Sequence, residues 1–282
     1  MPNAASSPID RRTAVQRLAA VAGSALLARP VVDGTAAPVA PGVQLYTVRS
    51  EMEKGVDRTL ARIATIGYRE VEFAGYFGKK PAQIAQWLKA NGLSAPSAHV
   101  ERDDMGKAWG RVLDEAATIG HRWVVVAWVP DKDRGSADAY RRLAAEFNAA
   151  GAAAKARGLS FAYHNHDFEF TPLGGTNGHE VLLRECDPAL VQFELDLYWT
   201  TKAKVDPVAY VARHAQRFPL VHVKDMTPAG AMTEVGAGTI PFQKIFDAAN
   251  GGIRHFFVEH DEPRVPFESV TQSLAALRRY TT

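Results

Sequence analysis

The sequence predicts a (β/α)₈ TIM barrel over residues 38–282. From Val43 onward, short β-branched or aromatic runs alternate with longer helical patterns, and this unit occurs eight times. The 245 residues that follow residue 37 match the ~250 residues typical of such a barrel. A doubly wound open sheet is the rival fold, but it normally has fewer strands and a glycine-rich first turn. The first predicted strand is not followed by such a turn.

The elements follow one another at regular spacing. The eight expected strands are Val43–Thr47, Glu70–Phe73, Ser94–His99, Trp123–Ala127, Ser160–His164, Val191–Asp196, Leu220–Lys224 and Phe256–Glu259. The clearest helical stretches between them are Asp57–Ile66, Pro81–Ala90, Ser136–Arg157, Asp206–Gln216 and Pro266–Arg279. A glycine stands where four of the helices should end, at Gly67, Gly92, Gly120 and Gly158.

Composition limits the function. Of the 282 residues, 46% are hydrophobic and 23% are charged, which is the balance of an ordinary globular protein. Cys186 is the single cysteine, so an intramolecular disulfide and a cysteine-rich zinc site are excluded, and a metal must be held by His, Asp or Glu. Once the four Arg and two Asp of the first 37 residues are set aside, 29 basic and 29 acidic residues remain. This neutral body predicts no nucleic-acid partner and no stable membrane insertion.

The first 37 residues resemble a twin-arginine export signal. Arg11 and Arg12 precede an apolar run from Leu18 to Ala28, and small residues follow at 35–37. The run has 11 residues, fewer than the ~20 needed to span a bilayer. We therefore expect a periplasmic protein, with a cytoplasmic one carrying a disordered or amphipathic arm as the alternative.

Strand alternation places polar side chains inside the barrel. In the sixth strand, Phe193 and Leu195 form the apolar set, so Asp196 must point inward. The same alternation directs His222 of the seventh strand inward. The inward side chains at strand ends include His164, Asp196, His222 and Glu259, which lie on four consecutive strands. This is the carboxyl end of the barrel, where active sites of this fold are built.

These four side chains predict a metal site. Each of them alone is more often a hydrogen-bonded interior residue, but their coincidence at four adjacent strand ends favours one shared divalent ion. Mixed nitrogen and oxygen ligands suit manganese, cobalt, zinc or iron better than calcium. We expect manganese first, with magnesium also open.

Several segments resemble the xylose isomerase-like TIM barrels, which are commonly labelled sugar phosphate isomerase/epimerase and include ketose 3-epimerases and inosose dehydratase. They are YHNHDFEF at 163–170, FELDLYW at 193–199, HVKD at 222–225 and VE at 258–259. The resemblance implies a divalent metal held by the matching residues His164, Asp196, His222 and Glu259. It also implies that Glu259 is both a ligand and a base.

One position departs from the ketose epimerases, which use two glutamates on either side of a carbon. His164 stands where they have the fifth-strand glutamate. Abstraction of an α-proton from a keto sugar or cyclitol remains the expected chemistry, followed either by reprotonation, as in an isomerase or epimerase, or by loss of a β-substituent. The alternatives are therefore a dehydratase or 3-keto-glycoside-cleaving enzyme, and a secreted carbohydrate-binding barrel. A nuclease acting at abasic sites is disfavoured by the neutral body.

Other inward or strand-end residues complete the expected site. Lys224 stabilises an enolate oxygen, acts as a base, or pairs with Glu194 or Asp196. His166 binds substrate or orients a ligand. Together with Glu259 they form the expected catalytic set. The expected sugar contacts are Glu72, His99, Tyr46, Trp128 and Trp199. We expect the substrate to be an unphosphorylated sugar or cyclitol, because exported compartments are poor in phosphate esters; the oligomeric state is left open.

Overall fold

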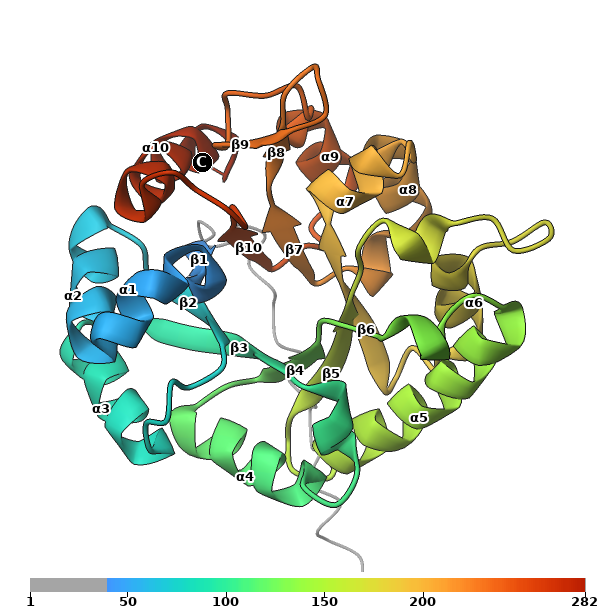
Figure 1. The fold of residues 1–282 in the computed structure, drawn as a ribbon, viewed down its shortest axis with the longest axis horizontal. Helices are drawn as coiled ribbons and strands as arrows, with labels where there is room; N and C mark the ends of the chain where they lie inside the picture. Colours follow the sequence, from blue (N-terminus) through green and yellow to red (C-terminus); the bar gives the residue numbers. More distant parts are fainter. Residues whose placement is uncertain (1–39, 282) are drawn as a thin grey trace, which may run out of the picture. The chain divides into compact units, whose positions relative to one another are not determined.

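The computed structural model describes residues 40–281, which form a closed barrel of parallel strands inside a ring of helices (Figure 1). The order of strands around the barrel is β1-β10-β7-β6-β5-β4-β3-β2. The strands are β1 Pro41–Gln44, β2 Glu70–Ala74, β3 Ser94–Val100, β4 Trp123–Val126, β5 Ser160–His164, β6 Val191–Asp196, β7 Leu220–Val223 and β10 His255–Val258. The predicted (β/α)₈ fold is confirmed.

Helices connect successive strands on the outside of the barrel. The α-helices are α1 Arg49–Lys54, α2 Val56–Ile66, α3 Pro81–Ala90, α4 Trp109–Ile119, α5 Ala137–Lys155, α6 Gly178–Glu185, α7 Leu197–Lys202, α8 Pro207–His214, α9 Phe242–Ala248 and α10 Pro266–Thr281. Short 3₁₀ turns are η1 Leu45–Val48, η2 Arg102–Met105, η3 Asp131–Asp133, η4 Phe168–Phe170 and η5 Ala215–Arg217. A small antiparallel pair, β8 Asp225–Met226 with β9 Met232–Thr233, lies in the loop after β7.

The first strand is shorter than the sequence pattern predicts. It ends at Gln44, because the Gln44 side chain accepts a hydrogen bond from the backbone N–H of Tyr46 (3.0 Å) and opens the turn η1. The prediction that this strand extends to Thr47 is therefore wrong. As a result, Tyr46 lies on a turn at the barrel rim and is 40% exposed.

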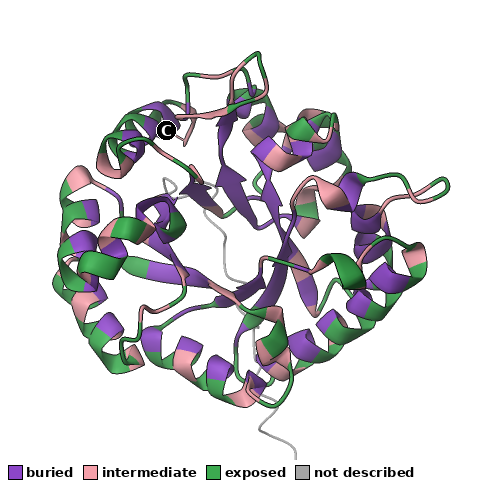
Figure 2. Cartoon of the chain, viewed as in Figure 1, coloured by how far each residue is buried: buried purple, intermediate pink, exposed green. Residues whose placement is uncertain are grey.

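The barrel interior has an apolar part and a polar part. Five apolar side chains form a cluster separate from the main core; they are Trp123, Val125, Ala162, Leu220 and Phe257. The alternate residues Val221 and Val223 pack in the main core. Figure 2 shows the strands buried almost throughout, while the outer faces of the helices are exposed. Buried polar side chains occupy the interior toward the strand ends, as the alternation predicts.

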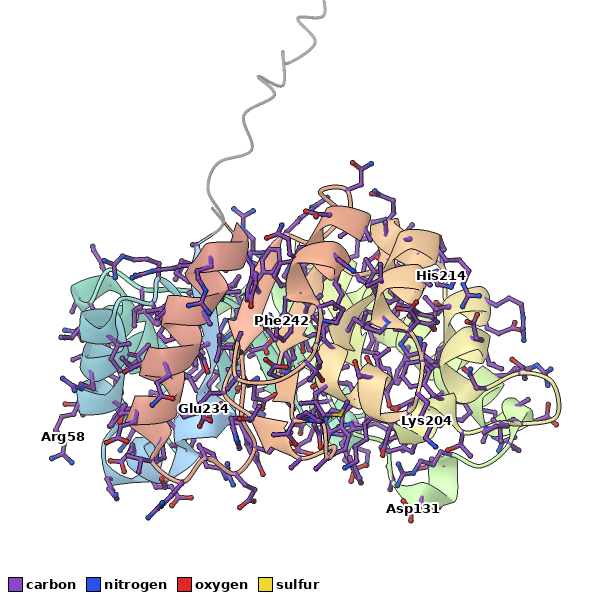
Figure 3. All side chains as sticks on the ribbon, turned by 90° about the horizontal axis from the view of Figure 1, so that it is seen from above. Arg58, Asp131, Lys204, His214, Glu234 and Phe242 are labelled. Atoms are coloured by element: carbon purple, nitrogen blue, oxygen red, sulfur yellow. The ribbon has the colours of Figure 1, made fainter. Side chains whose placement is uncertain are left out.

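The loops that follow the strands gather at one edge of the barrel. In the edge-on view of Figure 3, Asp131 and Glu234 lie toward this edge and His214 lies toward the opposite one. None of the helices between residues 40 and 281 combines the length and the apolar character that a bilayer crossing requires. The export signal expected over residues 1–37 lies outside the described residues.

Close packing at Gly151 gives a test of the fold. Gly151 lies inside α5, where alanine normally stabilises a helix by ~0.5–1 kcal/mol relative to glycine. Here an added Cβ would lie 2.4 Å from the backbone oxygen of Leu190. We expect Gly151→Ala to lower the free energy of unfolding, measured in urea, by ~1–3 kcal/mol, because the backbone of α5 or of the segment at Leu190 must shift to make room for the methyl group.

Gly110 of α4 is the matched control, since its added Cβ would meet only the guanidinium end of Arg157, at 3.2 Å. We expect Gly110→Ala to leave stability unchanged or slightly raised. Equal stability of both variants would show that α5 does not pack this closely against the segment that contains Leu190.

Candidate metal centre and active site

Four side chains from neighbouring strands converge at the carboxyl end of the barrel. They are His164 at the end of β5, Asp196 at the end of β6, His222 in β7 and Glu259 directly after β10. One potential ligand atom from each lies within 4.8 Å of all the others, and all four residues are buried. His164 Nε2 lies 3.3 Å from Asp196 Oδ2, and His222 Nδ1 lies 2.7 Å from Glu259 Oε2. The structure thus brings the four sequence-predicted metal ligands together.

The donor atoms of this cluster are close but poorly aligned for hydrogen bonds. Both ring nitrogens of His164, Oδ2 of Asp196 and Nδ1 of His222 are buried without a hydrogen bond. Burial of polar atoms without a well-aligned hydrogen bond is costly, and a cation shared between them would reduce the cost. Burial lowers the pKa of His164 to about 4, so its ring is neutral at pH 7 and offers a lone pair. This donor set fits a divalent metal ion.

Local hydrogen bonds fix the direction of Asp196. Its Oδ1 accepts the backbone N–H of Trp199 (2.9 Å) and so caps α7. Its own backbone N–H donates to Oδ1 of Asn165 (3.0 Å). Because one carboxylate oxygen is used by the helix, Oδ2 is the atom that faces His164.

Lys224 places an ammonium group beside the same carboxylates. Its Nζ lies 3.0 Å from Asp196 Oδ2, 2.8 Å from Glu259 Oε2 and 2.9 Å from Asp261 Oδ1. Although burial lowers the pKa of Lys224, these carboxylates hold that pKa well above its usual range. Lys224 is therefore a fixed positive charge, and it pairs with Asp196 and not with Glu194. This arrangement disfavours Lys224 as a base.

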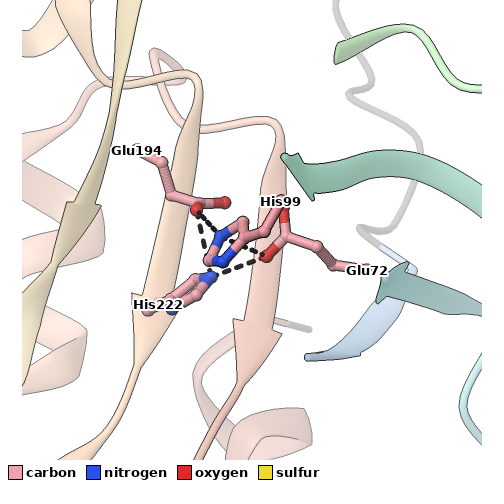
Figure 4. A group of neighbouring side chains, drawn as sticks. All are labelled: Glu72, His99, Glu194 and His222. Carbon is pink, nitrogen blue, oxygen red and sulfur yellow. Dashed lines mark hydrogen bonds and ion pairs between the residues drawn. The ribbon is translucent and has the colours of Figure 1, made fainter. Parts of the chain in front are cut away.

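A second group of buried side chains contacts the other ring nitrogen of His222 (Figure 4). His222 Nε2 lies 2.6 Å from Glu72 Oε2 and 3.1 Å from Glu194 Oε2. His99 Nε2 lies 2.7 Å from Glu194 Oε2 and 3.3 Å from Glu72 Oε2. Gln44 Nε2 donates a further hydrogen bond to Glu72 (2.8 Å). We call Glu72, His99, Glu194 and His222 the inner cluster.

The inner cluster bears on the expected roles of Glu72 and Glu194. Glu72 is fully buried against His222, and this position does not favour direct contact with a sugar. The predicted sugar contact of Glu72 therefore stays a prediction. Glu194 was not among the expected site residues, although alternation along its strand places it inward beside Asp196. Its contact with His99 comes from β3, across the barrel, and no pattern within one strand reveals such a pairing.

Aromatic side chains form one wall of the site. The His166 ring centroid lies 5.0 Å from that of His164, 5.3 Å from Trp128 and 5.4 Å from Trp199. Burial, followed by the nearby His164, lowers the pKa of His166 to about 2, so this ring is neutral. Glu169 accepts the backbone N–H of His166 (2.8 Å) and the hydroxyl of Tyr163, which fixes the loop after β5. His166, Trp128 and Trp199 thus lie near the candidate metal ligands, as expected from the sequence.

The expected sugar contacts divide into two places. Trp199 stands beside Lys224, whose Nζ lies 5.8 Å from its ring centroid. Tyr46, His99 and Trp128 line a single cavity of about 420 Å³ at the rim, on the side of β2 to β4. Their roles in substrate binding stay predictions.

Comparison with solved structures gives two relatives from Parabacteroides distasonis, each described as a sugar phosphate isomerase/epimerase. The first is 27% identical, with a TM-score of 0.77, and the match covers 89% of this chain and 98% of the relative. The second is 25% identical, also with a TM-score of 0.77, and covers 86% of this chain and all of the relative.

More distant structures share the fold alone. An L-ribulose 3-epimerase is 16% identical with a TM-score of 0.66, and the match covers 85% of this chain and 93% of the epimerase. An IolI protein with a bound zinc atom is 12% identical with a TM-score of 0.69, and the match covers 86% and 98% of the two chains.

No curated protein matches the sequence. The sequence model described as xylose isomerase-like TIM barrel matches residues 60–280, which is most of the chain. The chain belongs to the xylose isomerase-like TIM barrel family.

Proposed function

We propose that the protein is a divalent-metal-dependent sugar isomerase or epimerase that removes an α-proton from a keto sugar or cyclitol. The observation that carries this proposal is the buried group of His164, Asp196, His222 and Glu259, whose potential ligand atoms lie within 4.8 Å of one another. The family assignment and the sugar isomerase/epimerase relatives support it. We expect manganese first among the divalent metals.

The four residues would hold the metal, and the chain supplies the proton chemistry. A bound divalent cation would polarise the sugar carbonyl and stabilise negative charge on its oxygen. Both ion pairs of Glu259, with Lys224 and with His222, use Oε2. We assign Oε1 as the atom that accepts the proton from the carbon next to the carbonyl, while the C–H electron pair moves toward the carbonyl oxygen.

Lys224 and His166 bind and orient the reacting sugar in this proposal. The Lys224 ammonium stabilises the oxygen on which negative charge develops through its fixed positive charge, while its three N–H donors face three carboxylates. The neutral His166 ring lies against Trp128 and Trp199 and orients a sugar hydroxyl. Proton return to the same carbon epimerises the sugar, and return to the neighbouring carbon isomerises it.

Glu72 positions His222 in this scheme. Although burial lowers it, Glu194 and Glu259 hold the pKa of His222 well above its usual range, so without a metal both ring nitrogens carry a proton. Glu72, 2.6 Å from Nε2, would keep the proton on that nitrogen when a metal replaces the proton on Nδ1. This is the usual arrangement of a carboxylate behind a metal-bound imidazole.

A lyase is the second candidate, and His164 is the observation that favours it. The fifth-strand end carries an imidazole, and Asp261, the nearest further carboxylate, is paired with Lys224. With one carboxylate base, the site can remove a proton and expel a β-substituent without a second carboxylate to return the proton.

We propose an uncharged substrate for either reaction. Three basic groups near the site already have acidic partners: Lys224 contacts three carboxylates, Arg49 pairs with Glu262 (3.3 Å), and Arg134 pairs with Asp131. A phosphate group at the rim would lie near acidic side chains, and these three cations would be unavailable to bind it because they already pair with carboxylates.

Metal retention tests the ligand set. Asp196→Ala removes a buried ligand, and we expect it to lower manganese affinity by more than the ~10–100-fold that loss of a residue behind a ligand costs. The measurement is metal content by elemental analysis after dialysis against a series of manganese concentrations. Asp138→Ala is the control, because that carboxylate is 74% exposed on α5. Equal metal retention in the two variants would refute the ligand set.

The positioning role of Glu72 has a matched control on the same strand. Glu70 forms a similar pair with His255 (2.8 Å) at the other end of β2, away from the metal centre. We expect Glu72→Gln to weaken manganese binding by ~10-fold or more, and Glu70→Gln to change it by less than about 2-fold. Calorimetric titration of the metal-free proteins measures both. Equal affinities would show that His222 needs no carboxylate behind it.

Proton exchange tests the role of Glu259. In deuterated water, we expect the manganese-loaded protein to incorporate deuterium next to the carbonyl of a reactive keto sugar from a panel that includes fructose and fructose 6-phosphate. Glu259→Gln should lower the exchange rate by ~10²–10⁴-fold and change sugar affinity much less, because Gln keeps an oxygen but cannot take a proton. If Glu259→Gln exchanges normally while His166→Ala does not, His166 is the base. Loss of a substituent in place of simple exchange would identify a lyase.

A further inference from the structure

Two exposed aromatic side chains mark a cavity beside the metal centre. Among the described residues, three large hydrophobic side chains are exposed: Trp128 (49%), Val265 (43%) and Tyr46 (40%). Trp128 and Tyr46 both line the rim cavity of about 420 Å³, and Val265 does not. Exposing a large aromatic ring costs free energy unless the ring has a ligand or partner to cover it.

Two residues of the rim cavity pack against side chains of the metal centre. His99 lines it, and its ring centroid lies 5.2 Å from that of His222 and 5.3 Å from that of His164. Trp128 lines it from the other side and lies 5.3 Å from His166. A molecule bound at the metal centre can therefore extend over His99 into the cavity.

The lining fits a sugar ring better than an apolar or an anionic group. Tyr46, Tyr76 and Trp128 supply aromatic surface. The Arg49 guanidinium lies 4.0 Å from the Tyr46 ring centroid and that of Arg134 lies 5.0 Å from the Trp128 ring centroid, which leaves the other face of each ring for a sugar. Glu101 and Asp104 supply acceptors for hydroxyl groups.

The charge of the lining disfavours a phosphate group. Its one guanidinium, that of Arg111, is paired with Glu115, also in the lining, at 2.7 Å, so the acidic side chains Glu101 and Asp104 outweigh it. The volume lies within the ~300–1,000 Å³ of small-molecule sites.

We infer that the rim cavity binds the second ring of an uncharged, two-ring sugar whose keto ring lies at the metal centre. The inference rests on the proposed function, which places a keto sugar at that centre. It makes the substrate a keto-disaccharide or a glycoside of a keto sugar, with Trp128 and Tyr46 as the aromatic surfaces for the second ring.

The test compares binding of one ring with binding of two. The probes are fructose and three disaccharides that contain a fructose unit, which are turanose, lactulose and isomaltulose. They differ in the fructose carbon that carries the second ring. Calorimetric titration of the full-length, manganese-loaded protein measures each dissociation constant. We expect at least one disaccharide to bind about 10-fold or more tightly than fructose.

Variants then locate the second ring. We expect Trp128→Ala or Tyr46→Ala to reduce the ratio of disaccharide to fructose affinity to less than about 2-fold. Val265→Ala is the matched control, since it removes the exposed hydrophobic side chain outside the cavity, and should keep the ratio. Circular dichroism shows whether each variant is folded. The inference is overturned if no disaccharide binds more tightly than fructose, or if the ratio survives in both aromatic variants.

Binding and exchange separate this inference from the proposed function. A disaccharide that binds tightly in a manner dependent on Trp128, but exchanges no proton, would support the cavity and contradict the proposed chemistry. Exchange on fructose with no preference for a disaccharide would support the chemistry and contradict the cavity.

Discussion

The His222 side chain joins the two buried polar groups on which the centre of the barrel depends. Its Nε2 lies 2.6 Å from Glu72 and its Nδ1 lies 2.7 Å from Glu259, so one ring contacts carboxylates on both sides. Ionised carboxylates are expensive to bury, and each of them must find a cation or a donor. Here the partners come from strands on different sides of the barrel, so these contacts can form only when the barrel is closed.

Charge balance explains why the site is suited to a divalent cation. Asp196, Glu259 and Asp261 bring three negative charges to one place, and Lys224 supplies one positive charge. Burial raises the pKa of Asp196, but the nearby Lys224 ammonium outweighs this effect and lowers that pKa to about 2. The Asp196 carboxylate is therefore ionised at neutral pH. While no metal is bound, His222 supplies a second positive charge, because Glu194 and Glu259 hold its pKa well above its usual range although burial lowers it. A divalent ion that replaces the Nδ1 proton of His222 would balance the three carboxylates together with Lys224, and it would coordinate one of the buried nitrogens of His164. The two basic side chains at the centre, Lys224 and His222, already face carboxylates, which disfavours a phosphate there.

The eight repeated strand–helix units and their total length were sufficient to predict the fold, and period-two alternation predicted the inward direction of the four candidate ligands. It works because an apolar neighbour such as Val221 or Val223 fixes which face of a strand packs against the helices. It could not predict that β1 ends at Gln44, since that depends on a side-chain hydrogen bond. It also could not predict the contact of Glu194 with His99, or the burial of Glu72, because both depend on the radius and tilt of the closed barrel.

The most direct test of the central claim is the position of the metal itself. Crystals of the protein grown with manganese should give an anomalous scattering peak among His164, Asp196, His222 and Glu259, with Nδ1 of His222 facing it and Glu72 still bonded to Nε2. A peak among Glu72, His99 and Glu194 of the inner cluster, on the Nε2 side of His222, would contradict the account. A map with no peak, in which the Lys224 ammonium is the only cation between Asp196 and Glu259, would also contradict the account.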